Sequence, residues 1–307
     1  MDPLTWSSQT YLILIACLIL LHIFFPWPAH PLARFAREFC LLLPAGLFYF
    51  LVRGAVVART DEAMERAEAL VALERSLGIF IEPRLQEAIL DHRLLVDLAN
   101  WVYIWGHWPV ILAWTVWLWS RHRRVYPIYR NAFLISGGIG LIIFVLFPVA
   151  PPRFQVGWEF VDTVMQRSRS YRVLQPPALA NPYAAMPSLH VGWNLLVGIG
   201  LVRQARHWSW RAFGVTLPLA MTLAVILTAN HFVLDVVAGM SLALFGFACA
   251  IALRRWRERR TAQSAATLAA GPDRATPPMA LLDEPLTVRP GEAGQRQSEG
   301  RGQRAAM

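Results

Sequence analysis

The stretch HFVLDVVAGMSLALFGFACAIAL, residues 231–253, decides the fold, because it is apolar over enough residues to cross a bilayer as one helix. Apolar residues make up 56% of the chain, and its mean hydropathy of +0.40 is too high for an ordinary soluble domain. Six further apolar segments have similar lengths: residues 11–25, 39–57, 99–120, 131–149, 188–202 and 212–228. We therefore predict an all-α fold, a polytopic membrane helix bundle of about six to seven transmembrane helices with amphipathic surface helices.

The distribution of arginine predicts how these segments are oriented. The chain has no lysine, and its arginines gather in the loops after the first, third and fifth segments and after residue 253. The positive-inside rule makes those loops cytoplasmic, so the loops 54–98 and 148–187 lie outside. The first outer loop is rich in acids and carries Ala67, Leu70, Leu73 and Leu77 at helical spacing, which indicates one or two amphipathic helices on the outer surface. Because the arginines are spread over several loops, we expect no nucleic-acid partner.

Composition divides the chain into two parts. Residues 1–260 contain every apolar segment and form the predicted membrane-embedded domain, with a core at about 40–255. From residue 261 onward there is no aromatic residue, and Ala, Gly, Pro, Gln and Arg dominate. This composition predicts a disordered cytoplasmic tail over residues 261–307.

Two histidines and one aspartate stand at the starts of apolar segments. His190 belongs to Met186-Pro187-Ser188-Leu189-His190, and the last segment opens with His231-Phe232-Val233-Leu234-Asp235. Ionisable groups at a membrane edge are costly to desolvate and usually mark a functional site. His231 and Asp235 are four residues apart and share one helix face, so the carboxylate can fix the tautomer of the imidazole. We expect these three side chains to carry the chemistry.

Phosphoryl transfer is a reaction that such side chains can perform. His231 can attack phosphorus when its other nitrogen is held by an acceptor, and His190 can protonate the leaving oxygen. Arg153 is the candidate ligand for the phosphate oxygens, since a guanidinium binds phosphate in a bidentate manner. Ser188 stands at a helix start, where backbone N–H groups favour an anion, and Asn230 could cap the last segment in the same way.

These elements carry a resemblance to a known family. Pro187-Ser188-Leu189-His190 and His231-x-x-x-Asp235, each opening a membrane helix, resemble the type 2 phosphatidic acid phosphatase superfamily, which also contains vanadium haloperoxidases. The usual signature of that family is KxxxxxxRP, then PSGH, then SRxxxxxHxxxD. Here there is no lysine, Leu189 replaces the glycine, and Thr228-Ala229-Asn230 precedes His231 without a Ser-Arg pair. The departures resemble the branch of fungal inositol phosphorylceramide synthase and actinobacterial relatives, in which residues 147–153 (FPVAPPR) would be the first motif.

The resemblance covers residues 40–255 and implies a role for each matched residue. His231 would be the nucleophile, His190 the general acid and Asp235 the residue that orients His231, while Arg153 and Ser188 would hold the phosphate. Arg167, Arg169 or Arg172 could complete the phosphate site, and the sequence does not choose among them.

The implied protein is a membrane lipid-phosphate phosphatase or phosphotransferase with a phosphohistidine intermediate and no cofactor or metal. It would be integral to the plasma (cytoplasmic) membrane of a bacterium, with an extracytoplasmic active site. Its partners would be a lipid phosphate, membrane lipids and, for transfer, inositol or another alcohol acceptor. The sequence leaves the lipid, the head group, the choice between hydrolysis and transfer and the oligomeric state open.

Other interpretations of the same residues remain. His190, His231 and Asp235 could instead bind a metal in an intramembrane metallohydrolase. A non-enzymatic lipid-binding or transport protein would explain the arginines of the second outer loop but not the pairing of imidazole with carboxylate. Asn100, Tyr103 and His107 share one helix face and could line the substrate cleft, or could anchor the helix at the interface together with neighbouring tryptophans.

Overall fold

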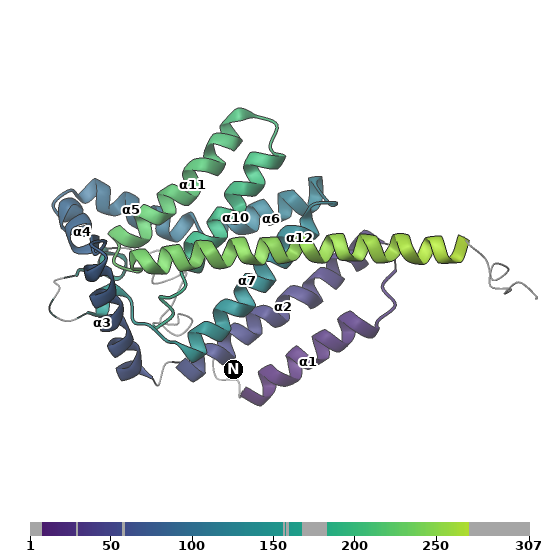
Figure 1. Cartoon of the computed structure of the whole chain (residues 1–307), viewed down its shortest axis with the longest axis horizontal. Helices are drawn as coiled ribbons and strands as arrows, with labels where there is room; N and C mark the ends of the chain where they lie inside the picture. The colour runs from purple at the N-terminus through teal and green to yellow at the C-terminus, as the bar shows by residue number, and fades with distance from the viewer. Residues whose placement is uncertain are drawn as a thin grey trace, which may run out of the picture. The chain divides into compact units, whose positions relative to one another are not determined.

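The computed structural model describes residues 8–28, 30–56, 59–155, 157, 160–167 and 183–269, in which helices are joined by short loops (Figure 1). In chain order, the helices are α1 (Ser8–Phe24), α2 (Pro31–Val56), α3 (Thr60–Ser76), α4 (Glu82–Leu90), α5 (Arg93–Trp105), α6 (Trp108–Arg121), α7 (Tyr126–Leu146), the short η2 (Pro152–Phe154), α8 (Thr163–Arg167), α10 (Leu189–Gln204), α11 (Trp208–Leu227) and α12 (Val233–Ala269). The described residues form no strand, only an isolated parallel bridge between Val149 and Ala184. The predicted all-α fold is confirmed.

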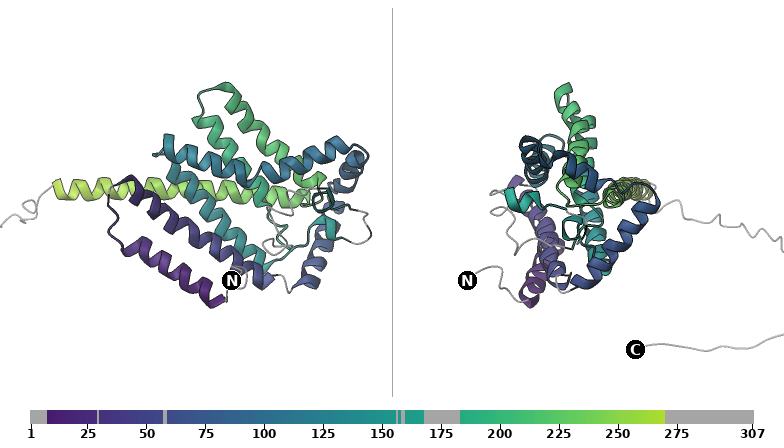
Figure 2. Two further views of the ribbon diagram at one scale, coloured as in Figure 1. Left: turned by 180° about the vertical axis from the view of Figure 1, so that it is seen from behind. Right: turned by 90° about the vertical axis from the view of Figure 1, so that its left-hand side faces the viewer.

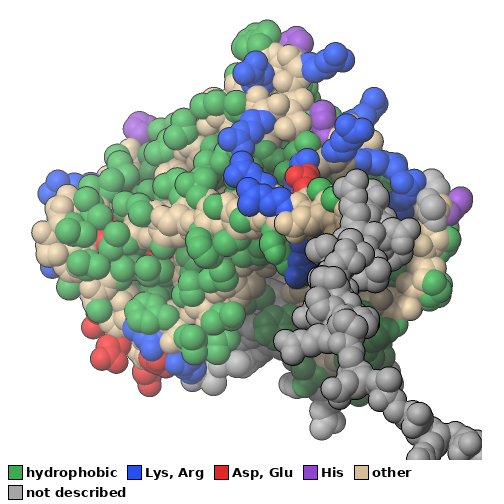
Figure 3. Space-filling model, turned by 45° about the vertical axis from the view of Figure 1, so that its right-hand side comes forward, with side chains coloured by type: hydrophobic (Ala, Val, Ile, Leu, Met, Phe, Trp, Pro, Cys, Tyr) green, Lys and Arg blue, Asp and Glu red, His purple; other side chains and the backbone are tan. Residues whose placement is uncertain are grey.

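The predicted apolar segments correspond to helices with one exception. Segments 11–25, 39–57, 131–149, 188–202, 212–228 and 231–253 fall on α1, α2, α7, α10, α11 and α12. Within the described residues, α7, α11 and the Val233–Thr267 part of α12 are both long and apolar enough to cross a membrane, and Leu12–Phe24 forms a shorter apolar helix. Many large hydrophobic side chains are exposed, and Figure 3 shows them spread over the face in view, as expected for helices that contact lipid.

The exception is the third predicted segment, 99–120, which is broken into α5 and α6 at Gly106 and His107. Pro109 is the second residue of α6 and has no N–H to continue the hydrogen bonds of α5, so one helix ends and another begins. A Cβ on Gly106 would lie 2.4 Å from the carbonyl oxygen of Val102, and 3.2 Å from Cε of Met221 in α11. The break therefore requires a residue without a side chain.

Glycines let α10 and α12 cross at close range. A Cβ on Gly192 of α10 would lie 2.3 Å from the carbonyl oxygen of Gly239, and a Cβ on Gly239 would lie 2.0 Å from that of Ser188. Small residues at helix crossings allow such close approach of backbones in membrane proteins. α10 and α11 form an antiparallel pair beside the first part of α12, as Figures 1 and 2 show from two sides. The crossing brings the starts of α10 and α12 together.

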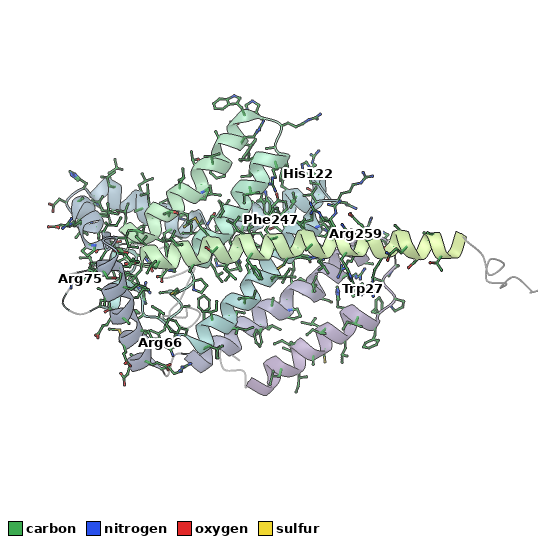
Figure 4. The ribbon with its side chains drawn as sticks, viewed as in Figure 1. Trp27, Arg66, Arg75, His122, Phe247 and Arg259 are labelled. Atoms are coloured by element: carbon green, nitrogen blue, oxygen red, sulfur yellow. The ribbon has the colours of Figure 1, made fainter. Side chains whose placement is uncertain are left out.

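The predicted surface helices of the loop 54–98 correspond to α3 and α4. Ala63, Ala67 and Leu70 of α3 are buried against a cluster that includes Val149, Ala150, Ala185 and Phe232. Leu73 and Leu77, which we had placed on the same apolar face as Ala67 and Leu70, are 48% and 57% exposed instead. In Figure 4, Arg66 and Arg75 mark α3 at the end of the helices where α12 begins, whereas His122 lies at the opposite end.

The chain divides into two units, residues 1–258 and 259–307. The described part of the second unit is the end of α12, whose last residue is Ala269. Residues 261–269, predicted to begin a disordered tail, are therefore helical, in keeping with the alanines in TAQSAATLA. The rest of the predicted tail, 270–307, lies outside the described residues.

Candidate active site

The turn between α11 and α12 places His231. Thr228 ends α11, Ala229 has a left-handed backbone with φ of 53°, and the N–H of Asn230 donates to the carbonyl of Val225 at 3.0 Å. The N–H of His231 donates to the same carbonyl at 3.1 Å. This is the Schellman arrangement that commonly ends helices, with alanine where glycine is usual. The turn reverses the chain and fixes the backbone of His231 before α12 begins.

The imidazole of His231 is held by a backbone carbonyl and a carboxylate. Its Nδ1 lies 2.8 Å from the carbonyl oxygen of Ala185 and 3.5 Å from Oδ2 of Asp235, and the residue is 4% exposed. A carbonyl oxygen can only accept, so Nδ1 carries the proton and Nε2 keeps its lone pair in the neutral ring. The sequence suggested Asp235 as the group that orients His231, and Ala185 is an additional and closer partner.

Asp235 also fixes the local backbone of two helices. Its Oδ2 accepts from the N–H of Phe232 at 2.8 Å, and its carbonyl accepts from the N–H of Ser188 at 2.9 Å. Asp235 thus caps the start of α12 while its main chain holds the start of α10. Asn230, which we expected to cap α12, instead donates from Nδ2 to the carbonyl and hydroxyl oxygens of Thr228.

His190 lies in a row of aromatic rings that reaches His231. Its ring centroid is 4.1 Å from that of His107, 4.8 Å from that of Tyr103 and 5.7 Å from that of His231. Asn194, one turn further along α10, donates to the carbonyl of His190 at 2.8 Å and lies 3.3 Å from Nδ1 of His107. The structure therefore brings two of the three suggested cleft residues, Tyr103 and His107, against His190.

Arg153 is anchored on the turn that carries His231. Its main-chain N–H donates to the carbonyl of Ala229 at 3.0 Å, and its guanidinium donates to Oδ1 of Asn230 and pairs with Oδ2 of Asp162 at 3.2 Å. The side chain is 14% exposed. A guanidinium held by these two partners keeps a fixed orientation.

Ser188 is the N-cap residue of α10 and is fully buried. Its Oγ has no hydrogen-bond partner among the described residues. A buried hydroxyl of this kind is free to donate to an anion bound at the start of α10, where the backbone N–H groups point.

Other suggested residues lie apart from this cluster. Asn100 is buried, but its side-chain amide is bonded to Thr163 of α8 through both of its polar atoms, at 3.0 Å and 2.9 Å. It therefore anchors α8 to α5. Arg167, at the end of α8, is exposed. Arg169 and Arg172 lie outside the described residues.

Sequence reasoning missed two acids beside this site. Glu74 of α3 and Glu82 of α4 are fully buried, and Oε1 of each accepts a backbone N–H of α12, from Leu234 at 2.7 Å and from Val233 at 2.8 Å. The sequence does contain a signal for Glu74. It follows Ala63, Ala67 and Leu70 at helical spacing, which places a charged residue on the apolar face of α3. Glu82 precedes a proline at a helix start, and the sequence offers no comparable signal for its burial.

The cluster combines a histidine with a free Nε2, a second histidine, a fixed guanidinium and an unpartnered hydroxyl. Such a set can attack a phosphorus centre, protonate a leaving group and stabilise anionic oxygens. Within the part of the chain that the structure describes, no three His, Cys, Asp or Glu side chains are grouped as they would be to bind a metal ion.

Similarity to known proteins points to an enzyme that acts on lipid phosphates. The family model of the PAP2 superfamily matches residues 68–264. The phosphoinositol dihydroceramide synthase of Bacteroides thetaiotaomicron is 22% identical over 199 residues, which cover 58% of this chain and 65% of that protein. The chain thus matches slightly less than two thirds of the length of this relative. No solved structure matches the chain significantly. The resemblance inferred from the motifs is confirmed at the level of the family.

Proposed function

The chain belongs to the PAP2 superfamily, and on that premise we propose that it is an integral membrane lipid-phosphate phosphatase or phosphotransferase that works through a phosphohistidine at His231. One observation carries the proposal. The carbonyl of Ala185, 2.8 Å from Nδ1 of His231, keeps the ring proton on Nδ1 and leaves the lone pair on Nε2. A neutral imidazole with that tautomer is a nucleophile at neutral pH.

The first half-reaction needs one bond made and one broken. Nε2 of His231 forms a bond to phosphorus while the bond from phosphorus to the leaving oxygen breaks, and His190 gives its proton to that oxygen. In the second half, water or an alcohol loses a proton to His190 and attacks phosphorus, which releases His231. The 5.7 Å between the two ring centroids lets both imidazoles reach one phosphoryl group. As Nε2 attacks, Asp235 and Ala185 stabilise the positive charge on the ring of His231.

Arg153 and Ser188 would bind the non-bridging oxygens of the phosphoryl group. Charge on these oxygens grows in the transition state, and fixed donors that meet it there are usually the largest catalytic contribution. The guanidinium of Arg153 is already oriented by Asn230 and Asp162, so little reorganisation is needed when the phosphate arrives.

The site would face the extracytoplasmic side of a bacterial plasma membrane. The support is the arginine distribution, which assigns the loops 26–38, 121–130 and 203–211 to the cytoplasm. The ends of α7 and α11 and the starts of α10 and α12 would then lie on the other side, together with α3 and α4. A lipid phosphate in the outer leaflet would reach the site from there.

A second candidate is an inositol-phosphate (head-group) transferase of the inositol phosphorylceramide synthase type. The relative from Bacteroides thetaiotaomicron, a phosphoinositol dihydroceramide synthase by name, favours this candidate. Hydrolysis and transfer share the first half-reaction and differ only in whether water or an alcohol meets the phosphohistidine. An assay of phosphate release and of lipid products, with and without added inositol, separates the two.

The test of the mechanism is a set of purified variants assayed on lipid phosphates. His231→Ala and Asp235→Asn should abolish turnover, whereas His92→Ala, which alters an exposed histidine at the start of α5, should not change it. Vanadate should inhibit the wild-type protein because it mimics the five-coordinate phosphorus. Full activity of His231→Ala would reject the proposal, and loss of activity with a chelator that added metal restores would favour the metallohydrolase instead.

A further inference from the structure

We propose that Glu74 and Glu82 are positioning residues of this site, which hold the first turn of α12 by its backbone and through that turn fix His231 and Asp235. The inference rests on the proposed function for its effect on turnover, but it concerns residues that the reaction itself does not use. They act through the backbone of α12, so neither is a catalytic residue.

Three carboxyl groups from three helices bind successive N–H groups at the start of α12. The N–H of Phe232 donates to Asp235 at 2.8 Å, that of Val233 to Glu82 at 2.8 Å and that of Leu234 to Glu74 at 2.7 Å. The first N–H groups of a helix have no partner within the helix, and acceptors there also interact favourably with the helix dipole. Glu74 and Glu82 thus tie two surface helices to the turn that carries the imidazole–carboxylate pair.

Glu74 and Glu82 are two acids in the same buried site. Oε2 of each is buried and has no hydrogen-bond partner among the described residues. Burial, followed by the interaction with the Glu82 side chain, raises the pKa of Glu74 from 4.5 to about 9, so Glu74 is protonated at neutral pH. A protonated carboxyl group can donate to a carboxylate, whereas two ionised carboxylates can only accept.

The raised pKa of Glu74 makes the support of α12 dependent on pH. The charges that act on Glu74 are those of Glu82 on α4 and Asp235 on α12, and both are acidic. The pKa of Glu74 is raised in the folded protein relative to the unfolded chain. Its contribution to the free energy of unfolding is therefore fully present below a pH of about 4.5 and is lost as the pH rises through about 9. Above that pH a second negative charge would stand beside Glu82 in a fully buried site, and the pair would repel.

The test compares a truncating and a conservative change at the same position. Glu74→Ala removes the acceptor of the Leu234 N–H and should lower kcat by about 100-fold with little change in KM, because the reacting groups lose their alignment. Glu74→Gln keeps an acceptor for Leu234 and gains a permanent donor to Glu82, so it should retain wild-type kcat at pH 7. Glu68→Ala, on the exposed face of the same helix, is the matched control and should behave as wild type.

A pH profile distinguishes a positioning role from simple structural loss. The wild-type kcat should fall as pH rises through about 9, and Glu74→Gln should lack this decrease because an amide does not titrate. If Glu74→Ala does not fold, the pH profile of Glu74→Gln is the test by itself. A decrease of kcat at alkaline pH in Glu74→Gln that equals the decrease in wild type would overturn the proposal.

Hydrogen exchange tests the inference without an assay of activity. Amides of residues 232–234 should exchange faster in Glu74→Ala than in wild type, and at the wild-type rate in Glu74→Gln and Glu68→Ala. If the wild type turned over no lipid phosphate, the proposed function would fail while this measurement still tested the link to α12. The inference would be overturned if the amides of residues 232–234 exchanged in Glu74→Ala at the wild-type rate and if this variant, where turnover can be measured, also kept the wild-type kcat.

Discussion

Replacing Gly239 by alanine tests whether the close crossing of α10 and α12 sets the geometry of the site. The added Cβ would lie 2.0 Å from the carbonyl oxygen of Ser188, whereas real Cβ contacts do not fall below 3.0 Å. The obstacle is backbone, which cannot turn aside as a flexible side chain does, so the two helices must separate by about 1 Å. Ser188 and His190 would move with α10, away from His231 and Asp235.

The expected magnitude follows from that displacement. A misplacement of about 1 Å between reacting groups can cost about 100-fold in rate, which corresponds to about 2.7 kcal/mol of activation free energy. Forcing an extra methyl group into a packed site also costs about 1–3 kcal/mol of folding stability, against which alanine recovers about 0.5–1 kcal/mol over glycine within a helix. We therefore expect a protein that still folds, with a moderately lower unfolding midpoint and severely reduced kcat.

The assay is kcat for phosphate release from a lipid phosphate in detergent micelles, paired with thermal unfolding of the same preparation. Gly138→Ala in α7 is the matched control, because a Cβ at Gly138 would meet no atom within 4 Å. This control should retain wild-type kcat and unfold at the same or a higher temperature. Wild-type kcat in Gly239→Ala, or an equal loss in Gly138→Ala, would refute the reasoning that the crossing sets the distance between the imidazoles.

Three further changes test separate parts of the structure. Ala229→Gly should raise the free energy of unfolding by about 1 kcal/mol, because a left-handed backbone strains alanine but not glycine. Thermal unfolding should show a higher midpoint, and a lower midpoint would contradict this prediction. Arg153→Lys should lower kcat/KM on the order of 100-fold despite the retained charge, because an ammonium that binds Asn230 and Asp162 has only one donor left and cannot bind a phosphate in a bidentate manner. Near-wild-type kcat/KM would count against Arg153 as a phosphate ligand. Asn100→Ala should lower the free energy of unfolding by about 1–3 kcal/mol while KM stays unchanged, because it leaves Thr163 without its partner; a raised KM would place Asn100 in the substrate cleft instead.

Much of the fold could be predicted because lipid imposes a simple rule on the sequence. Long apolar segments must be helices where no water can bind the backbone, and six of the seven predicted segments fall on single helices. The seventh was misjudged because Pro109 lies inside an unbroken apolar run, and hydropathy does not register the loss of one N–H. Surface helices were predicted correctly in the loop 54–98. On the apolar face predicted for α3, Ala67 and Leu70 are buried, but Leu73 and Leu77 are exposed.

The sequence could predict those parts of the candidate site that depend on the chemistry of side chains, but not those that depend on the backbone or on tertiary packing. The spacing of His231 and Asp235, and the match of two short motifs, were enough to expect that His190 would join them. The carbonyl of Ala185 could not be foreseen, since any residue carries a carbonyl and this one is 46 positions away along the chain. Glu74 and Glu82 were missed because acids in a loop between apolar segments are ordinarily solvated, and only tertiary packing buries these two.

The break between α5 and α6 bears on how the protein is made. Around Gly106 and His107 the peptide groups leave the regular helical pattern, and lipid offers such groups no hydrogen bonds. The neighbours at the break are Asn194 of α10, which lies beside the His107 ring, and Met221 of α11, which lies beside Gly106, and both are synthesised about a hundred residues later. We therefore expect the α5–α6 segment to take up its final position only after α10 and α11 have emerged from the ribosome.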